Sequence, residues 1–98
     1  MVAIMTPLLA KLVPDAPSFS HDIADRISRL ATAGGCNAKR IVIDLSRAQE
    51  ASTSAFARLV LLRRVLLKCG RDLRLVNLRD QAAALYEVSR LHAILPRA

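Results

Sequence analysis

The segment from residue 40 to residue 77 constrains the fold most, because one long helical stretch lies between two strand-like stretches. RIVIDLS at 40–46 is a largely β-branched apolar run, which is typical of a central strand covered on both faces. Residues 54–69 contain no Gly or Pro and stop at Gly70, which predicts a helix of about four turns with a terminating glycine. DLRLVN at 72–77 alternates polar and apolar residues as a strand does. Two such strands joined by a helix predict parallel neighbours in an α/β fold.

The amino-terminal part adds one strand and one helix to this unit. LLAKLV at 8–13 is a short apolar run stopped by Pro14, which predicts a strand followed by a turn. SHDIADRISRLATAGG at 20–35 has apolar side chains at helical spacing, with Ser20 as the N-cap and Gly34-Gly35 as the end of the helix.

The carboxyl-terminal part predicts a last helix at 81–92, QAAALYEVSRLH, with Asn77 or Asp80 as its cap. Its predicted apolar face consists of Ala84, Leu85, Val88 and Leu91. The whole order is strand, helix, strand, helix, strand, helix. It predicts a single small α/β sandwich over residues 1–98, with a mostly parallel central sheet and helices packed on it.

The composition limits the classes of partner. A chain of 98 residues can bury one core, and its hydrophobic fraction of 53% is that of a globular protein. The net charge of +7 would suit an acidic protein, a nucleic acid or an anionic membrane surface. The arginines are scattered, with no run longer than two and no interleaved aromatic residues, which argues against nucleic-acid binding.

The cysteines and the first residues indicate a cytoplasmic protein. Cys36 and Cys69 form no CxxC pair and have no histidine nearby in sequence, so we expect free, partly buried thiols and no metal site. The apolar start of the chain is interrupted by Pro7, Lys11 and Pro14. We therefore expect neither a signal peptide nor direct insertion into a membrane.

Three adjacent hydroxyl residues, Ser52, Thr53 and Ser54, precede the long helix and have three interpretations. Ser52 or Thr53 could cap the helix, since Ser and Thr are preferred N-cap residues. A phosphate attached here would meet the free N–H groups of the helix start, so it would change partner binding without unfolding the domain. The third interpretation is a nucleophile, which the rest of the sequence does not support.

No catalytic arrangement accompanies the hydroxyls. There is no Gly-x-Ser-x-Gly motif, and the available bases, His21 and His92, have no recognisable relation to the triplet. Asp44 at a strand end is expected to hydrogen-bond the following loop rather than to act as an acid or base. A glycine-rich phosphate loop is also missing, so we expect no enzyme activity and no cofactor.

The helix at 54–69 has two apolar faces. The broader one is predicted to face the core and consists of Ala55, Phe56, Leu59, Val60, Leu62, Leu66 and Leu67. On the opposite side lie Ala57, Leu61 and Val65, flanked by Arg58, Arg64 and Lys68. An exposed apolar strip rimmed by cations predicts a docking surface for a protein, although scattered exposed apolar residues are also ordinary.

About the last 60 residues resemble the core of STAS domains, the fold shared by anti-sigma factor antagonists and the cytoplasmic tails of sulfate transporters. The family pattern is a strand ending in Asp-Leu-Ser, a helix opening with Asp-Ser-Ser-Gly, a Gly-ended helix, a strand, and a helix with a Leu-rich ending. The corresponding residues here are Asp44–Ser46, Ser52–Ala55, Gly70, Leu73–Asn77 and Leu91–Leu95. The start of the chain is shorter than in the family, as if the first strand were missing or replaced by residues 1–6.

The resemblance implies a non-enzymatic regulatory domain that binds an anti-sigma factor with serine kinase activity. The phosphoacceptor would be Thr53, with Ser52 or Ser54 as fallbacks, although Ser52 replaces the family's Asp and Ala55 its Gly. The alternative is the STAS subunit of a phospholipid-trafficking ABC transporter, which binds the transporter's ATPase through the same helix. The ending LHAILPR and the missing Asp resemble that subgroup. Residues 1–14 could complete the sheet or pair with another chain, which leaves a homodimer open.

Overall fold

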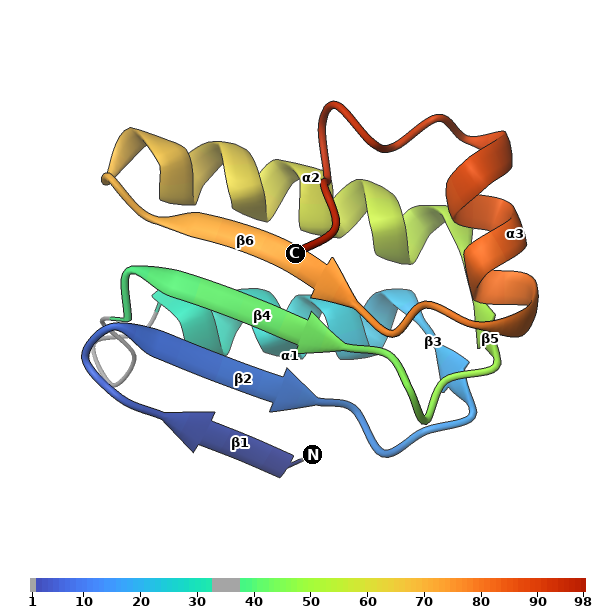
Figure 1. Ribbon diagram of the computed structural model, residues 1–98, viewed down its shortest axis with the longest axis horizontal. Coiled ribbons are helices and arrows are strands. Elements are labelled where there is room, and N and C mark those ends of the chain that lie inside the picture. Colours follow the sequence, from blue (N-terminus) through green and yellow to red (C-terminus); the bar gives the residue numbers. More distant parts are fainter. Residues whose placement is uncertain (1, 33–37) are drawn as a thin grey trace.

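The computed structural model describes residues 2–32 and 38–98. Four strands, β1 (Val2–Met5), β2 (Leu9–Val13), β4 (Arg40–Asp44) and β6 (Asp72–Val76), form a sheet in the order β1-β2-β4-β6 (Figure 1). β1 is antiparallel to β2, whereas β2, β4 and β6 run parallel. The predicted α/β class with a mostly parallel central sheet is confirmed. The first residues of the chain do supply an edge strand.

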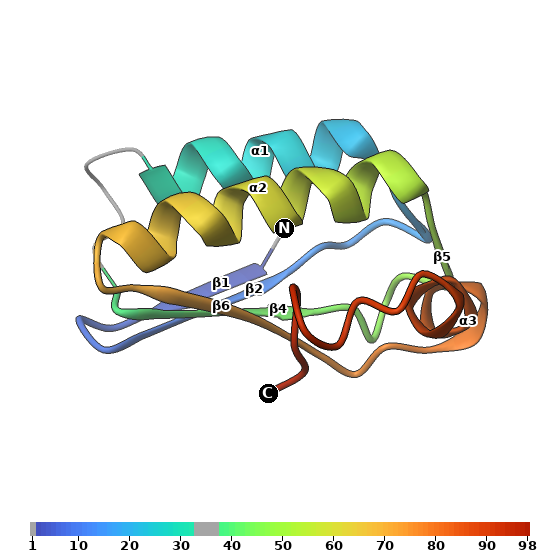
Figure 2. The same ribbon diagram turned by 90° about the horizontal axis from the view of Figure 1, so that it is seen from above.

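Helices α1 (His21–Thr32) and α2 (Thr53–Lys68) lie side by side on one face of the sheet, and none of the described helices covers the opposite face (Figure 2). α3 (Asp80–Val88) lies beyond the ends of β4 and β6 instead (Figure 1). The prediction that strand 40–46 is covered on both faces is therefore wrong. Ile41 and Ile43 are buried beneath the helices, but Val42, on the other face, is only partly buried.

The two long helices begin and end largely as predicted. Ser20 caps α1, because its Oγ accepts the Ile23 N–H at 3.4 Å. α2 ends in a Schellman arrangement around Gly70, whose φ is +72°. There the Arg71 N–H donates to the Leu66 carbonyl at 2.9 Å, which satisfies one of the last carbonyls of the helix.

Two predictions concern the turn after α1 and the two cysteine thiols. The expected helix terminators Gly34-Gly35, and Cys36, lie outside the described residues, and α1 ends at Thr32. Cys69 is free and exposed rather than partly buried, because it follows the last turn of α2.

α3 differs most from the prediction. It ends at Val88 rather than at residue 92. Its N-cap is Arg79 rather than Asn77 or Asp80, and no side chain makes a capping hydrogen bond there. The predicted apolar face is correct only in part. Leu91 is buried and Leu85 packs partly buried against the core, but Val88 is 80% exposed, and the buried residues of α3 itself are Ala82 and Tyr86. α3 does not cover the sheet face as α1 and α2 do. The side of α3 that is buried is therefore narrower than the predicted apolar face and is centred on other residues.

Candidate functional site

The three adjacent hydroxyls at residues 52–54 have three different environments. Ser52 is the N-cap of α2, and its Oγ accepts the Ala55 N–H at 3.1 Å. The Ser54 Oγ lies 3.1 Å from the Ser52 Oγ, within hydrogen-bond distance. The Thr53 side chain is exposed and forms no hydrogen bond with any other described residue. Capping by Ser52 is therefore confirmed, and the Thr53 hydroxyl is available for contact or modification.

The electrostatics of this helix start favour negative charge. The first turn of α2 contains no acidic residue, so no carboxylate opposes an anion there. The N–H groups at a helix start are positive and partly unpaired. A phosphate on the exposed Thr53 would meet this positive end, which the fold tolerates.

The loop before α2 is held from two sides. β5 (Glu50–Ala51) pairs in parallel with β3 (Ser18–Phe19) in a separate two-stranded sheet. The Ser52 N–H donates to the Phe19 carbonyl at 3.1 Å, and the Ala51 N–H donates to Gln81 Oε1 at 2.8 Å. These bonds tie the loop to β3 and to the first turn of α3. The backbone that carries the Thr53 hydroxyl is therefore held in place.

An apolar groove of about 360 Å³ lies beside Thr53, between α2 and the chain that follows α3. It is lined by Thr53, Phe56, Ala57, Val60, Leu61, Ser89, Leu91 and Ile94. Leu61 is 52% exposed and Ile94 is 50% exposed, so large apolar side chains from both walls meet the solvent. We refer to these eight residues as the groove.

The structure brings some of the predicted docking residues together. Thr53, Ala57 and Leu61 all line the groove. Arg58 does not, because its guanidinium is half-buried and its Nε lies 3.4 Å from the Asp25 carboxylate on α1. Arg58 therefore joins the two long helices.

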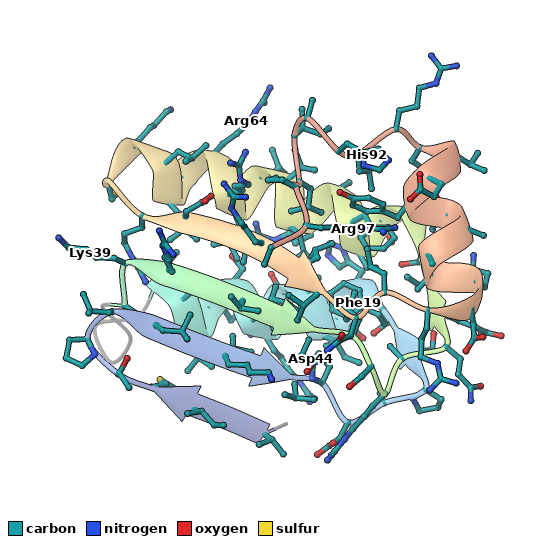
Figure 3. All side chains as sticks on the ribbon, in the orientation of Figure 1. Phe19, Lys39, Asp44, Arg64, His92 and Arg97 are labelled. Atoms are coloured by element: carbon teal, nitrogen blue, oxygen red, sulfur yellow. The ribbon has the colours of Figure 1, made fainter. Side chains whose placement is uncertain are left out.

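The strip predicted on the outer side of α2 continues past the groove. Val65 is 50% exposed and Arg64 is exposed, but neither lines the groove. Figure 3 shows Arg64 extending away from the body of the molecule. Leu67 was assigned to the core face but is 48% exposed, whereas the neighbouring Leu66 is buried, so Leu67 lies at the margin of the buried face of α2.

The far wall of the groove was not predicted. Residues 89–94 were expected to be partly helical, but α3 ends before them and Arg90 has φ +52°. The turn is fixed by Leu95, whose N–H donates to the Leu91 carbonyl at 2.7 Å and whose carbonyl accepts the Tyr86 hydroxyl at 2.8 Å. The apolar spacing of Leu91 and Ile94 was the available signal, but it fits a helix equally well.

The buried Tyr86 side chain supports the far wall of the groove from the interior of the protein. Its ring lies edge-on to Phe56 with centroids 6.3 Å apart, and the Arg97 guanidinium lies 4.9 Å from the ring centroid. Glu87 joins the same segment, at 2.9 Å from His92 Nε2 and 2.7 Å from Arg97 Nη2. Burial raises the pKa of the Tyr86 hydroxyl, so it stays protonated and remains a donor.

Asp44 has the structural role that the sequence predicted. Its carboxylate is buried, accepts the Ser46 N–H at 2.9 Å and lies 3.4 Å from Lys11 Nζ. Burial alone would raise the pKa of this carboxyl group. The hydrogen bonds from Ser46, Asn77 and Lys11 outweigh burial and hold the pKa below its ordinary value.

The described residues contain no group of three or more His, Cys, Asp or Glu side chains that could hold a metal ion. His21 is exposed at the start of α1, and His92 contacts Glu87 rather than the hydroxyl triplet. Among the helices described, none combines the length and apolarity needed to cross a lipid bilayer.

Comparison with known proteins agrees with this architecture. The solution NMR structure of the protein TM1081 superimposes with a TM-score of 0.76, at 13% sequence identity, over 98% of this chain and 78% of that one. A comparison with curated proteins found no match. The sequence profile described as "STAS domain" matches residues 16–97. The chain therefore belongs to the STAS domain family.

Proposed function

We propose that this STAS domain binds a protein partner through the groove, with Thr53 at its rim, and has no enzyme activity. The observation that best supports this proposal is the groove. Its walls are apolar, yet Leu61 and Ile94 remain half exposed on opposite sides of it. A contiguous apolar surface of this kind is stabilised when a partner covers it.

The geometry best supports the ATPase subunit of a phospholipid-trafficking ABC transporter as the partner. The resemblance to that transporter's STAS subunit rests on the ending LHAILPR, and Leu91 and Ile94 of this ending form the far wall of the groove. The resemblance to antagonists rests partly on an Asp that is Ser52 here, an uncharged cap. The features specific to the transporter subgroup thus lie in the groove itself.

An anti-sigma factor with serine kinase activity is the second candidate, and the Thr53 hydroxyl favours it. This hydroxyl is exposed, unbonded within the described residues and adjacent to the groove. A phosphate of about two negative charges there would oppose burial of the groove and release the partner. Either partner would place the domain in the cytoplasm.

Co-purification tests the docking surface. We expect the tagged domain, expressed in its own organism, to recover an ABC ATPase, and Leu61→Asp to abolish this recovery because a carboxylate would be buried without a partner. Leu67→Asp is the matched control, since Leu67 lies on the same helix, is 48% exposed and does not line the groove. Circular dichroism should show that both variants fold. Normal recovery with Leu61→Asp would refute docking at the groove.

Phosphate mapping separates the two partner classes. The domain is incubated with ATP and the candidate kinases encoded near its gene, and residues 52–54 are examined by mass spectrometry. Phosphate on Thr53, together with loss of kinase binding, would favour the anti-sigma factor and overturn the ABC assignment. An unmodified triplet, with an ATPase recovered through the groove, supports the transporter.

A further inference from the structure

A second cavity, separate from the groove, lies on the open face of the sheet. Leu9, Arg40 and Asp72 are the first residues of the three parallel strands and are paired in register. Paired residues on neighbouring strands project to the same face, so these three side chains form one row. Two residues further along, Lys11, Val42 and Arg74 form the next row on the same face; Lys11 is paired with Asp44 and does not line the cavity described below.

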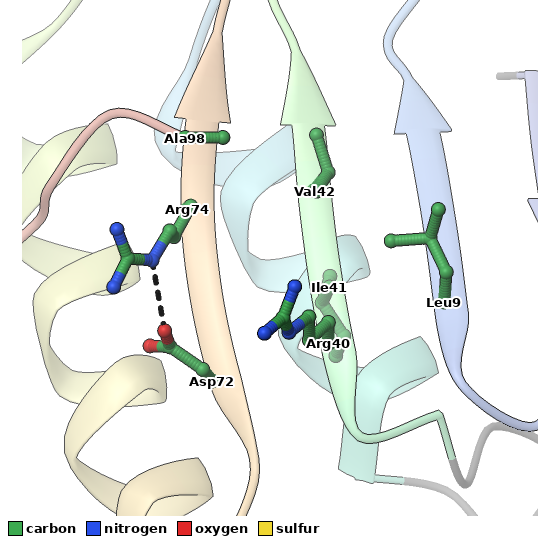
Figure 4. Close-up of a pocket in the computed structure, with 7 residues that line it drawn as sticks. All are labelled: Leu9, Arg40, Ile41, Val42, Asp72, Arg74 and Ala98. Carbon is green, nitrogen blue, oxygen red and sulfur yellow. Dashed lines mark hydrogen bonds and ion pairs between the residues drawn. The ribbon is translucent and has the colours of Figure 1, made fainter.

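These two rows enclose a cavity of about 340 Å³. Ala98 closes one side, because its N–H donates to the Leu75 carbonyl at 2.9 Å and so holds the end of the chain beside β6. Figure 4 shows the Arg40 side chain between β4 and β6, whereas Arg74 extends to the outer side of β6 toward Asp72; Val42 lies further along β4, and Leu9 lies on β2. The cavity thus combines two guanidinium groups with an apolar side.

The charges in the cavity do not balance. Asp72 is paired with Arg74 at 2.9 Å and with Arg63 at 3.0 Å. Burial would raise the pKa of Asp72, but the hydrogen bonds from Arg74 and the Leu73 N–H, with the charge of Arg63, hold it below its ordinary value. Arg40 is exposed and has no ion pair or side-chain hydrogen bond with any described residue. The residues that line the cavity therefore include two guanidinium groups, those of Arg40 and Arg74, and one side-chain carboxylate, that of Asp72.

We propose that this cavity binds the phosphate group of a small organic phosphate, with Arg40 as the main ligand and Arg74 as the second. Guanidinium groups bind phosphate oxygens through paired, charge-assisted hydrogen bonds. Leu9 and Val42 contact the apolar body of the molecule. The volume of about 340 Å³ suits a compact ligand rather than a protein segment.

This site is independent of the proposed docking function. The groove lies between α2 and the chain that follows α3, whereas the cavity lies on the face of the sheet opposite α1 and α2. The two share no lining residue. Failure of one proposal therefore leaves the other intact.

Titration of the full ¹⁵N-labelled chain with phenyl phosphate, followed by NMR, tests the site. We expect the amide signals of Leu9, Val42 and Arg74 to shift with saturation, while phenol, which lacks the phosphate, shifts none of them. Arg40→Gln should weaken binding at least about tenfold, because charge-assisted hydrogen bonds are lost. Arg40→Lys keeps the positive charge but loses the planar guanidinium group, so its affinity for phenyl phosphate should lie between those of Arg40→Gln and the unmodified protein. Arg90→Gln is the control, since Arg90 is exposed and lies outside the cavity.

The source of the phosphate is distinguished in a second arm. Flotation with phosphatidylglycerol vesicles, compared with phosphatidylcholine vesicles, supports a lipid headgroup if binding depends on Arg40. Saturable phenyl phosphate binding without flotation supports a soluble phosphorylated molecule. The proposal is overturned if phenyl phosphate binds no better than phenol, or if Arg40→Gln binds as tightly as the unmodified protein.

Discussion

Replacing Ser52 with alanine should lower the free energy of unfolding, whereas replacing Thr53 with alanine should not. The Ser52 Oγ accepts the Ala55 N–H at 3.1 Å and is the side-chain cap of α2. The Thr53 hydroxyl has no hydrogen-bond partner among the described residues. The two variants remove the same kind of group one residue apart, so they separate the structural hydroxyl from the available one.

The expected magnitude follows from the cap. Losing an N-cap Ser costs about 1 kcal/mol, within a range of about 0.5–2 kcal/mol. For a domain of this size, about 1 kcal/mol lowers Tm by roughly 4–8 °C. Thr53→Ala changes an exposed residue without partners, so its effect should stay within about 0.5 kcal/mol. Ser52→Asp should retain most of the stability, because Asp also caps helices and its charge suits the helix start.

Equilibrium urea unfolding, followed by far-ultraviolet circular dichroism, measures these differences. All four proteins should unfold with the same dependence on urea, so that midpoints report stability directly. The assignment of roles fails if Thr53→Ala destabilises the domain as much as Ser52→Ala does. It also fails if Ser52→Ala has the stability of the unmodified protein.

Two further predictions concern stability. Gly70→Ala should cost about 1 kcal/mol in urea unfolding, because φ is +72° while an added Cβ would meet nothing within 4 Å; equal stability would contradict this. Asp44 has a lowered pKa, so its contribution is complete above the ordinary value of 3.8 and is lost as the pH falls through the folded-state pKa. Asp44→Asn should therefore flatten the decline of unfolding free energy measured from about pH 6 to about pH 3, and an unchanged decline would exclude this role.

Much of the fold was predictable because its signals are local. The β-branched run of β4, the long helix of α2 and its terminating Gly70 each depend on neighbouring residues. The α2 cap at Ser52 was predictable for the same reason, since hydroxyl residues precede an uninterrupted helical stretch. The parallel order then followed from alternation of strands and helices.

The incorrect predictions depend on contacts between distant parts of the chain. β3 and β5 contain two residues each and exist through their mutual pairing, which no local pattern indicates. The open face of β4 results from the position of α3 beyond the sheet, which composition does not reveal. The end of α3 lacks a Gly or Pro signal, because Arg90 adopts a positive φ that glycine usually supplies.

The far wall of the groove was missed for a related reason. Leu91 and Ile94 are spaced as in a helix, but the Tyr86 hydroxyl binds the Leu95 carbonyl and fixes a turn instead. That contact requires Tyr86 to be buried against Phe56 of α2. The groove is therefore a product of tertiary packing, and only its α2 wall could be predicted from the spacing of Ala57 and Leu61.

Ser52 also bears on the identity of the partner. The fold requires a residue here that accepts an N–H bond, and Ser and Asp are about equally good at this position. Helix capping therefore does not account for a serine where antagonists have an aspartate. The difference lies one residue before Thr53, which lines the groove, so an aspartate there would place a negative charge near a partner bound in the groove and the serine places none. If Ser52→Asp keeps its stability but no longer recovers the proposed ATPase partner, the serine reflects the requirements of that partner rather than of the helix.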